Sequence, residues 1–211
     1  PLRTESAARV DEMRVLCREL GVAPVFVTGN HDPRISDMHA LELFDGAVLV
    51  THGDVLFDTL TPWSRFAPAL RRRFAEETAR AGAGVTPGLD VRLEIARRLS
   101  EYAPHLRGGG AGDPHASAGH YAAEFLHPFR PLAVLRCWIE TPGRAVALAE
   151  RWRPRARVIL IGHTHLPGCW RRRGRWVINT GGFAPVRPWA QTARIDRGGI
   201  DVLVDDYWGL Y

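Results

Sequence analysis

Three short segments of this chain combine histidine with glycine and with residues whose side chains end in oxygen. The segment 29–32 reads Gly-Asn-His-Asp, the segment 52–54 reads His-Gly-Asp, and the segment 162–165 reads Gly-His-Thr-His. Imidazole nitrogen mixed with amide and carboxylate oxygen is a ligand set for divalent transition metals, here manganese, iron or zinc. If the third segment is extended, the spacing of two residues puts His163 and His165 on one side, where they could serve two adjacent ions.

Each of these segments directly follows a short apolar run that predicts a buried strand. The runs are 24–28, 47–51 and 158–161, and each is nearly uninterrupted, as is typical of buried parallel strands. Ligands of open α/β sheets bind at the carboxyl ends of the strands, so we expect the three segments to meet at one edge. A single histidine at a strand end is more often a hydrogen-bonded structural residue than a ligand, but these histidines cluster.

Helical patterns surround the predicted strands. Apolar residues recur at helical spacing over 4–20, and again within 62–153, which we expect to be a mainly helical insertion. Within the insertion, the composition of 107–119 predicts a flexible loop, and Thr141-Pro142 predicts the start of a helix. We expect one domain over residues 1–211 that contains this insertion. The further predicted strands are 176–179, 192–196 and 200–204.

In their order along the chain, the three histidine segments resemble the third, fourth and fifth signature motifs of the calcineurin-like metallophosphoesterases. The later segment 179–183, Asn-Thr-Gly-Gly-Phe, is similar to the turn that follows the last motif in bacterial members. The resemblance implies an α/β fold, a two-sheet α/β/β/α sandwich with helices outside. It also implies a site for two divalent metal ions and hydrolysis of phosphate esters or pyrophosphates by a metal-bound hydroxide.

Carried over position by position, the resemblance implies that Asn30, His52 and His163 bind one metal ion and that His165 binds the other. Two cations about 4 Å apart would clamp the attacking and leaving oxygens and lower the pKa of a bridging water. The same carry-over gives His31 a catalytic role beside the metals.

The implied role of His31 is to stabilise the phosphoryl oxygens or to protonate the leaving group, with Asp32 as an orienting partner. Arginine can bind phosphate with two parallel hydrogen bonds. Candidate substrate contacts are therefore Arg34, directly after the first histidine segment, and Arg171, Arg172 and Arg173, shortly after the last.

Two motifs of the family are missing from the chain. Family members carry Asp-x-His after the first strand and Gly-Asp-x-x-Asp after the second, and these supply the bridging aspartate and most ligands of the second metal. Two segments come close to these motifs: Asp37-Met38-His39, and Gly53-Asp54 with Asp58. No predicted strand directly precedes Asp37, and Asp58 lies one residue too far along the chain, so we assign neither motif to them. We expect that roughly 40 to 60 N-terminal residues are absent, the length of a strand-loop-helix-strand unit, and that the chain alone is poorly active.

The position of the insertion narrows the substrate only partly. A long helical insertion between the fourth and fifth motifs is similar to the cap of the UDP-2,3-diacylglucosamine diphosphatase branch, which cleaves a pyrophosphate. That branch commonly has arginine after the last motif, where this chain has Leu166-Pro167. We therefore expect a phosphorylated small molecule or a nucleotide sugar as substrate.

The composition is that of a globular protein. The chain has 211 residues, 45% of them hydrophobic, and a formal net charge of +5, and every basic residue is an arginine. This composition excludes disordered and collagen-like classes. The three cysteines lack CxxC spacing and favour a reducing compartment. We expect a cytoplasmic protein; peripheral contact with the inner face of the membrane and the oligomeric state stay open.

Two functions of other classes also stay open. The chain could be a non-catalytic interaction module that kept the fold and lost the chemistry, as the missing motifs would suggest. It could also be a nucleic-acid-binding protein, which the positive charge favours. Neither explains three histidine segments at three strand ends, and most arginines fall outside those segments, so nucleic acid is not the partner we expect.

Overall fold

A mixed five-stranded sheet forms the centre of the computed structural model, which describes residues 2–82, 88–106, 130–184, 187–196 and 198–204. Its strand order is β1-β2-β3-β5-β4. The inner strands β2, β3 and β5 run parallel, and the outer strands β1 and β4 run antiparallel to their neighbours. The strand bounds are β1 Ala40–Leu43, β2 Val48–Thr51, β3 Val158–Ile161, β4 Gly168–Arg172 and β5 Arg175–Asn179.

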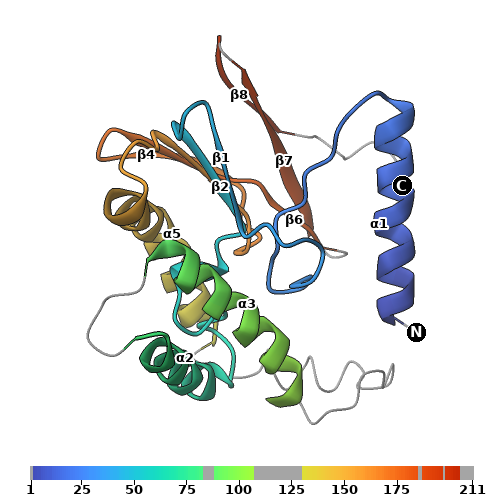
Figure 1. The fold of residues 1–211 in the computed structure, drawn as a ribbon. Helices are drawn as coiled ribbons and strands as arrows, with labels where there is room; N and C mark the ends of the chain where they lie inside the picture. The colour runs from blue at the N-terminus through green and yellow to red at the C-terminus, as the bar shows by residue number, and fades with distance from the viewer. Residues whose placement is uncertain (1, 83–87, 107–129, 185–186, 197, 205–211) are drawn as a thin grey trace.

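Three helices cover one face of this sheet (Figure 1). Leu49 of β2, Ile159 of β3 and Val177 of β5 point toward the helices and pack with them in one core. All three side chains are fully buried. This placement on one face is expected, because successive side chains of a strand point to opposite faces. The helices are α2 Ala67–Ala81, α3 Leu89–Leu106 and α5 Arg130–Trp152.

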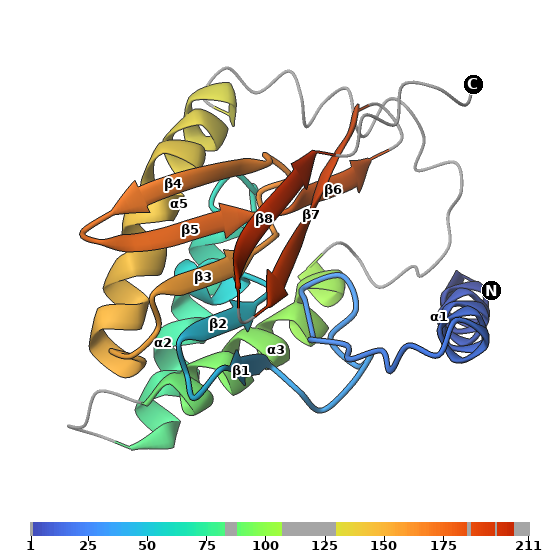
Figure 2. The same ribbon diagram turned by 90° about the horizontal axis from the view of Figure 1, so that it is seen from above.

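A second, three-stranded sheet lies against the other face (Figure 2). Its strands are β6 Gly181–Ala184, β7 Arg187–Asp196 and β8 Gly199–Val204. The alternate residues Val48, Val158 and Ile178 of the central sheet pack there with Ala193 and Ile195 of β7. The described chain is thus a mixed α/β protein whose central sheet is covered by helices on one face and by strands on the other.

The predicted N-terminal helix is confirmed as α1, Leu2–Glu19. It lies apart from α2, α3 and α5, on the far side of the molecule in both views (Figures 1 and 2). Its apolar residues Met13 and Leu16, and Leu20 just after it, are more than half exposed. No described helix is long and apolar enough to cross a membrane.

Two sequence predictions about elements are wrong. The run 24–28 is not a strand, because within the described chain its backbone N–H groups find one partner: the N–H of Thr28 donates to the carbonyl oxygen of Met38 at 2.8 Å. No helix starts at Thr141-Pro142; α5 runs through Pro142 without interruption. Packing overrides the proline there, since the helix buries Cys137 before it and Ala145 after it against the same core.

The other strands that the sequence predicts are present in the structure. The predicted strands 47–51 and 158–161 are β2 and β3, and they pair in parallel. The strands predicted at 176–179, 192–196 and 200–204 are β5, part of β7 and β8. The outer strands β1 and β4 were not predicted, and the loop predicted at 107–119 lies outside the described residues.

Candidate metal centre

Asn30, His52 and His163 meet at the carboxyl end of β2 and β3. The Oδ1 atom of Asn30 lies 2.7 Å from Nε2 of His52 and 3.1 Å from Nδ1 of His163. The two imidazole rings stand edge to face with their centroids 5.2 Å apart. Three candidate ligands thus converge, although the segment before Asn30 is not a strand.

Close backbone contacts bring the three segments together. The N–H of Gly162 donates to the carbonyl oxygen of His52 at 2.9 Å. A Cβ atom at Gly29 would lie 2.8 Å from the ring of His52, so only glycine lets this segment approach the ring. Gly53, with φ of 103°, turns the chain into the short 3₁₀-helix η1, Asp54–Leu56.

A backbone carbonyl fixes the proton of His163. Its Nε2 lies 2.7 Å from the carbonyl oxygen of Leu60, and a carbonyl can only accept, so Nε2 carries the proton. Burial first, and then the charge of His52, lowers the pKa of His163 to about 4, so the ring is neutral at neutral pH. Its Nδ1 atom therefore turns a lone pair toward Oδ1 of Asn30, and a cation between these two acceptors would satisfy both.

The neighbouring histidines also disfavour added protons on the rings, whereas the Asp54 carboxyl favours a proton on His163. Burial lowers the pKa of His52 to about 4, and the charges of His31 and His165 act in the same direction. Burial raises the pKa of the Asp54 carboxyl, whose Oδ1 accepts the N–H of Val55 at 2.9 Å. Neutral imidazole is the form that binds metal, so this environment keeps the rings ready for a cation.

His31 and His165 form the outer part of the cluster. Their ring centroids lie 6.2 Å apart, and both residues are exposed. A Cβ atom at Gly182 would lie 3.0 Å from the ring of His165, so β6 packs closely against that ring. Asp32 is exposed as well.

The donor set fits one divalent cation better than two. Asn30, His52 and His163 offer one amide oxygen and two imidazole nitrogens to the first ion. For a second ion the resemblance assigns His165 alone. Among the described residues, no group of three or more His, Cys, Asp or Glu side chains could hold a metal.

The structure does not bring the predicted arginine contacts to this cluster. In the register of the β4–β5 hairpin, Gly168 pairs with Asn179 near the cluster, whereas Arg172 pairs with Arg175 at the opposite end of the strands. Arg173 forms an ion pair with Glu150 at 2.9 Å. The hairpin thus carries residues 171–173 away from the histidine cluster, and their contact with substrate stays a prediction.

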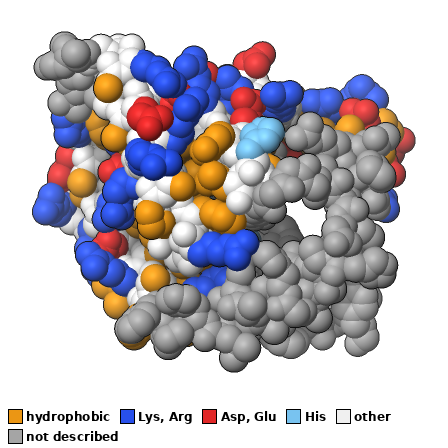
Figure 3. Space-filling model, turned by 90° about the horizontal axis from the view of Figure 1, so that it is seen from below, with side chains coloured by type: hydrophobic (Ala, Val, Ile, Leu, Met, Phe, Trp, Pro, Cys, Tyr) orange, Lys and Arg blue, Asp and Glu red, His pale blue; other side chains and the backbone are white. Residues whose placement is uncertain are grey.

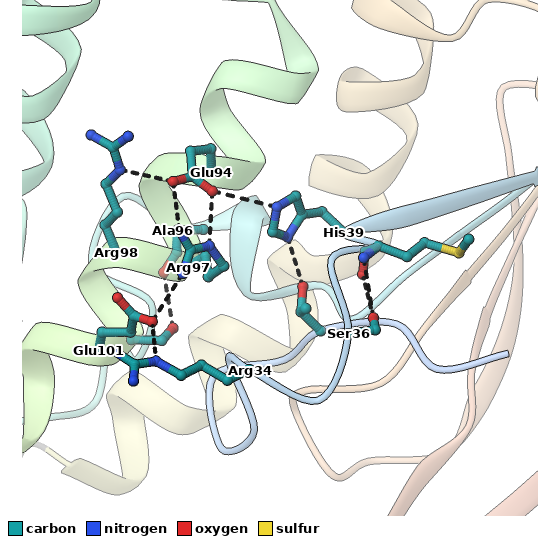
Figure 4. A network of polar contacts seen from close by, with 11 residues as sticks. Arg34, Ser36, His39, Glu94, Ala96, Arg97, Arg98 and Glu101 are labelled. Carbon is teal, nitrogen blue, oxygen red and sulfur yellow. Dashed lines mark hydrogen bonds and ion pairs between the residues drawn. The ribbon is translucent and has the colours of Figure 1, made fainter.

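Arg34 belongs to a polar network between the segment 29–39 and α3 (Figure 4). Its Nε donates to Glu101 at 2.7 Å, and Arg97 pairs with both Glu101 and Glu94. His39 lies 3.4 Å from Glu94 and 2.8 Å from the hydroxyl of Thr28. This network holds the segment that carries Asn30 against the helices, and it engages the guanidinium group that was predicted to bind substrate.

Two arginines of the helical segment hold the loop that presents the carbonyl of Leu60. Arg92 of α3 donates to the carbonyl oxygen of Val55 at 3.1 Å and to Asp58 at 2.5 Å. Arg144 of α5 donates to the carbonyl oxygen of Leu56 at 3.3 Å. The loop after His52 is therefore anchored from two helices.

Several residues around His163 were missed by sequence reasoning. The rings of Trp63 and Phe57 have centroids 5.7 and 6.4 Å from that of His163. The indole N–H of Trp138 donates to the carbonyl oxygen of Thr164 at 3.1 Å. A tryptophan between apolar residues gives no signal that separates these contacts from ordinary core packing, and the Leu60 carbonyl has no sequence signal at all.

Comparison with known proteins gives no family for this chain: no protein-family model matches it, and no curated protein matches it.

Proposed function

We propose that this chain is a metal-dependent hydrolase of phosphate esters or pyrophosphates whose first cation is held by Asn30, His52 and His163. The observation that carries the proposal is the proton position on His163. Because the Leu60 carbonyl accepts the Nε2 proton, the Nδ1 lone pair points at Oδ1 of Asn30 rather than at a hydrogen-bond donor. A purely structural histidine would gain nothing from two acceptors facing each other at 3.1 Å.

In the proposed hydrolysis, the metal ion and the surrounding side chains would have separate roles. Bound manganese, iron or zinc supplies a Lewis acid and a water of lowered pKa. His31, exposed at the mouth of the cluster, would donate a proton to the leaving oxygen or a hydrogen bond to the phosphoryl oxygens. His165, held at the same mouth 6.2 Å from His31, would serve the second ion. Asp32, also exposed there, would orient His31.

The layers of the fold support the finer architecture of the proposal. Helices on one face of a central sheet and a second sheet on its other face are three of the four layers that the α/β/β/α sandwich of the metallophosphoesterases would require. The proposed substrate remains a phosphorylated small molecule or a nucleotide sugar.

The test combines metal content with turnover in the full chain. After dialysis against Mn²⁺, we expect about one tightly held ion per chain, and slow hydrolysis of bis(p-nitrophenyl) phosphate. Alanine at His163 should abolish both metal retention and turnover, whereas alanine at His31 should abolish only turnover. His105→Ala, on α3, is the matched control and should change neither.

Each other result has a clear reading. Equal metal loss in the His31 and His163 variants would refute the role of His31. Two tightly held ions per chain and fast turnover would refute the expectation that this chain is poorly active. Metal retention without any hydrolysis would favour the non-catalytic interaction module.

A further inference from the structure

The segment 162–165 has a backbone that must be held in place. His163 and His165 have φ values of 66° and 55°, in the left-handed region that L-residues other than glycine rarely adopt. Such conformations persist only where surrounding contacts determine them. Since both residues belong to the candidate centre, the contacts that hold this segment also set where the two rings point.

Asn179 makes those contacts. It is fully buried at the end of β5, and its Nδ2 donates both to the carbonyl oxygen of Gly162 at 2.9 Å and to the hydroxyl oxygen of Thr164 at 2.8 Å. Its Oδ1 accepts the N–H of Gly181 at 2.9 Å. One amide therefore grips the segment on both sides of His163 and also holds the start of β6, which packs against His165.

Two other elements hold the backbone of Asn179 and of the segment that it contacts. The side chain of Gln191, buried in β7, donates to the backbone carbonyl oxygen of Asn179 at 2.7 Å. The indole of Trp138 on α5 donates to the carbonyl oxygen of Thr164. Hydrogen bonds from both sheets and from one helix thus hold the segment 162–165 in place. An ordinary surface loop does not need such rigidity.

We propose that Asn179 and Thr164 are positioning residues that set the orientation of the His163 ring, and through it the affinity of the centre for a divalent cation. The inference rests on the proposed function for its ligand. Groups that orient a metal ligand without touching the metal commonly contribute 10- to 100-fold to metal affinity, and the hydrogen bonds of Asn179 to Gly162 and Thr164 hold the segment that carries the candidate ligands.

The test uses a pair of substitutions that removes and then restores one contact. Thr164→Val keeps the shape but removes the oxygen that accepts from Asn179, and Thr164→Ser keeps that oxygen. Thr141→Val is the matched control, because Thr141 is also buried and, within the described chain, its hydroxyl bonds inside α5, to the carbonyl oxygen of Cys137 and near its sulfur. Co²⁺ serves as the probe, since its visible absorption reports the geometry of its ligands.

We expect Thr164→Val to weaken Co²⁺ binding about tenfold or more and to change the spectrum of the bound ion. Thr164→Ser should restore both, and Thr141→Val should alter neither, although it lowers the melting temperature. In the cation-free chain, long-range ¹H–¹⁵N spectra should show the Nε2 proton of His163 fixed in the parent and in Thr164→Ser but averaged between the two nitrogens in Thr164→Val.

The two readouts separate this inference from the proposed function. If the parent binds no Co²⁺ but Thr164→Val still releases the His163 proton position, the metal proposal fails and the positioning role stands. If the parent binds Co²⁺ and Thr164→Val leaves affinity, spectrum and proton position unchanged, the positioning role is overturned.

Discussion

The Oδ1 atom of Asn30 faces both His52 and His163, and its chemistry can separate a ligand from a structural amide. Asn30→Asp keeps an oxygen at that place and adds negative charge, so we expect it to retain or tighten Mn²⁺ binding, whereas Asn30→Ala should weaken it about tenfold. Titration calorimetry of both variants measures this. If Asn30 instead served as an N–H donor to the two rings, Asp and Ala would be equally damaging.

The buried rings also make the cation-free chain sensitive to acid. The folded-state pKa of His163, lowered to about 4 by burial and by His52, lies below its ordinary 6.5. Between these values the unfolded chain binds more protons, so stability falls as pH falls from 6.5 to 4, by roughly 3 kcal/mol for this ring. His52 acts in the same direction, and Asp54, whose pKa burial raises, acts in the opposite one.

Urea unfolding across this pH window measures the effect. In His163→Gln, which cannot titrate there, the loss of stability should be about half as steep, because His52 still contributes. The same slope in the parent and in the variant would mean that His163 is not held neutral. The candidate ligands could be proposed from sequence because their side chains carry the chemistry, whereas the Leu60 carbonyl beside His163 is backbone and could not be predicted.

At the level of elements, the sequence predicts the strands that are buried on both faces of the sheet. It does not predict strand pairing or helix boundaries that depend on neighbouring parts of the fold. The runs that became β2 and β3 are apolar throughout and form inner parallel strands. The run 24–28 is just as apolar, but a strand also needs a paired backbone, and no described strand runs beside it. Pro142 predicts a helix boundary from local chemistry alone, and the continuous buried face of α5 outweighs it.

The anchoring of the η1 loop by α3 can be tested at the element level. Arg92→Met removes the donors to Val55 and Asp58 and leaves a buried carbonyl oxygen without its partner. We expect a loss of about 1–3 kcal/mol in unfolding free energy, measured by urea denaturation. Arg72→Met, on the exposed side of α2, is the control and should cost less than about 0.5 kcal/mol. Equal losses would show that Arg92 does not anchor the loop.

Among the described residues, many arginines form ion pairs with nearby acidic side chains. Each described helix pairs arginines with its own acidic residues, as in Arg9 with Glu12, Arg73 with Glu77 and Arg144 with Glu140. Figure 3 shows one face on which basic side chains are dispersed among hydrophobic and acidic ones rather than gathered in one patch. On this face of the described chain, the basic side chains therefore do not form a continuous track for a phosphate backbone.

This distribution predicts weak binding to nucleic acid. A protein that neutralises several phosphates loses affinity steeply as salt rises, because each contact releases counterions, and dispersed, paired arginines offer few such contacts. With a short fluorescent single-stranded oligonucleotide at physiological salt, anisotropy should give a Kd no tighter than about 1 μM, the non-specific range. Tighter binding with a steep salt dependence would instead mean that the arginines form a continuous track, and the nucleic-acid-binding function would then replace the hydrolase as the better account of the chain.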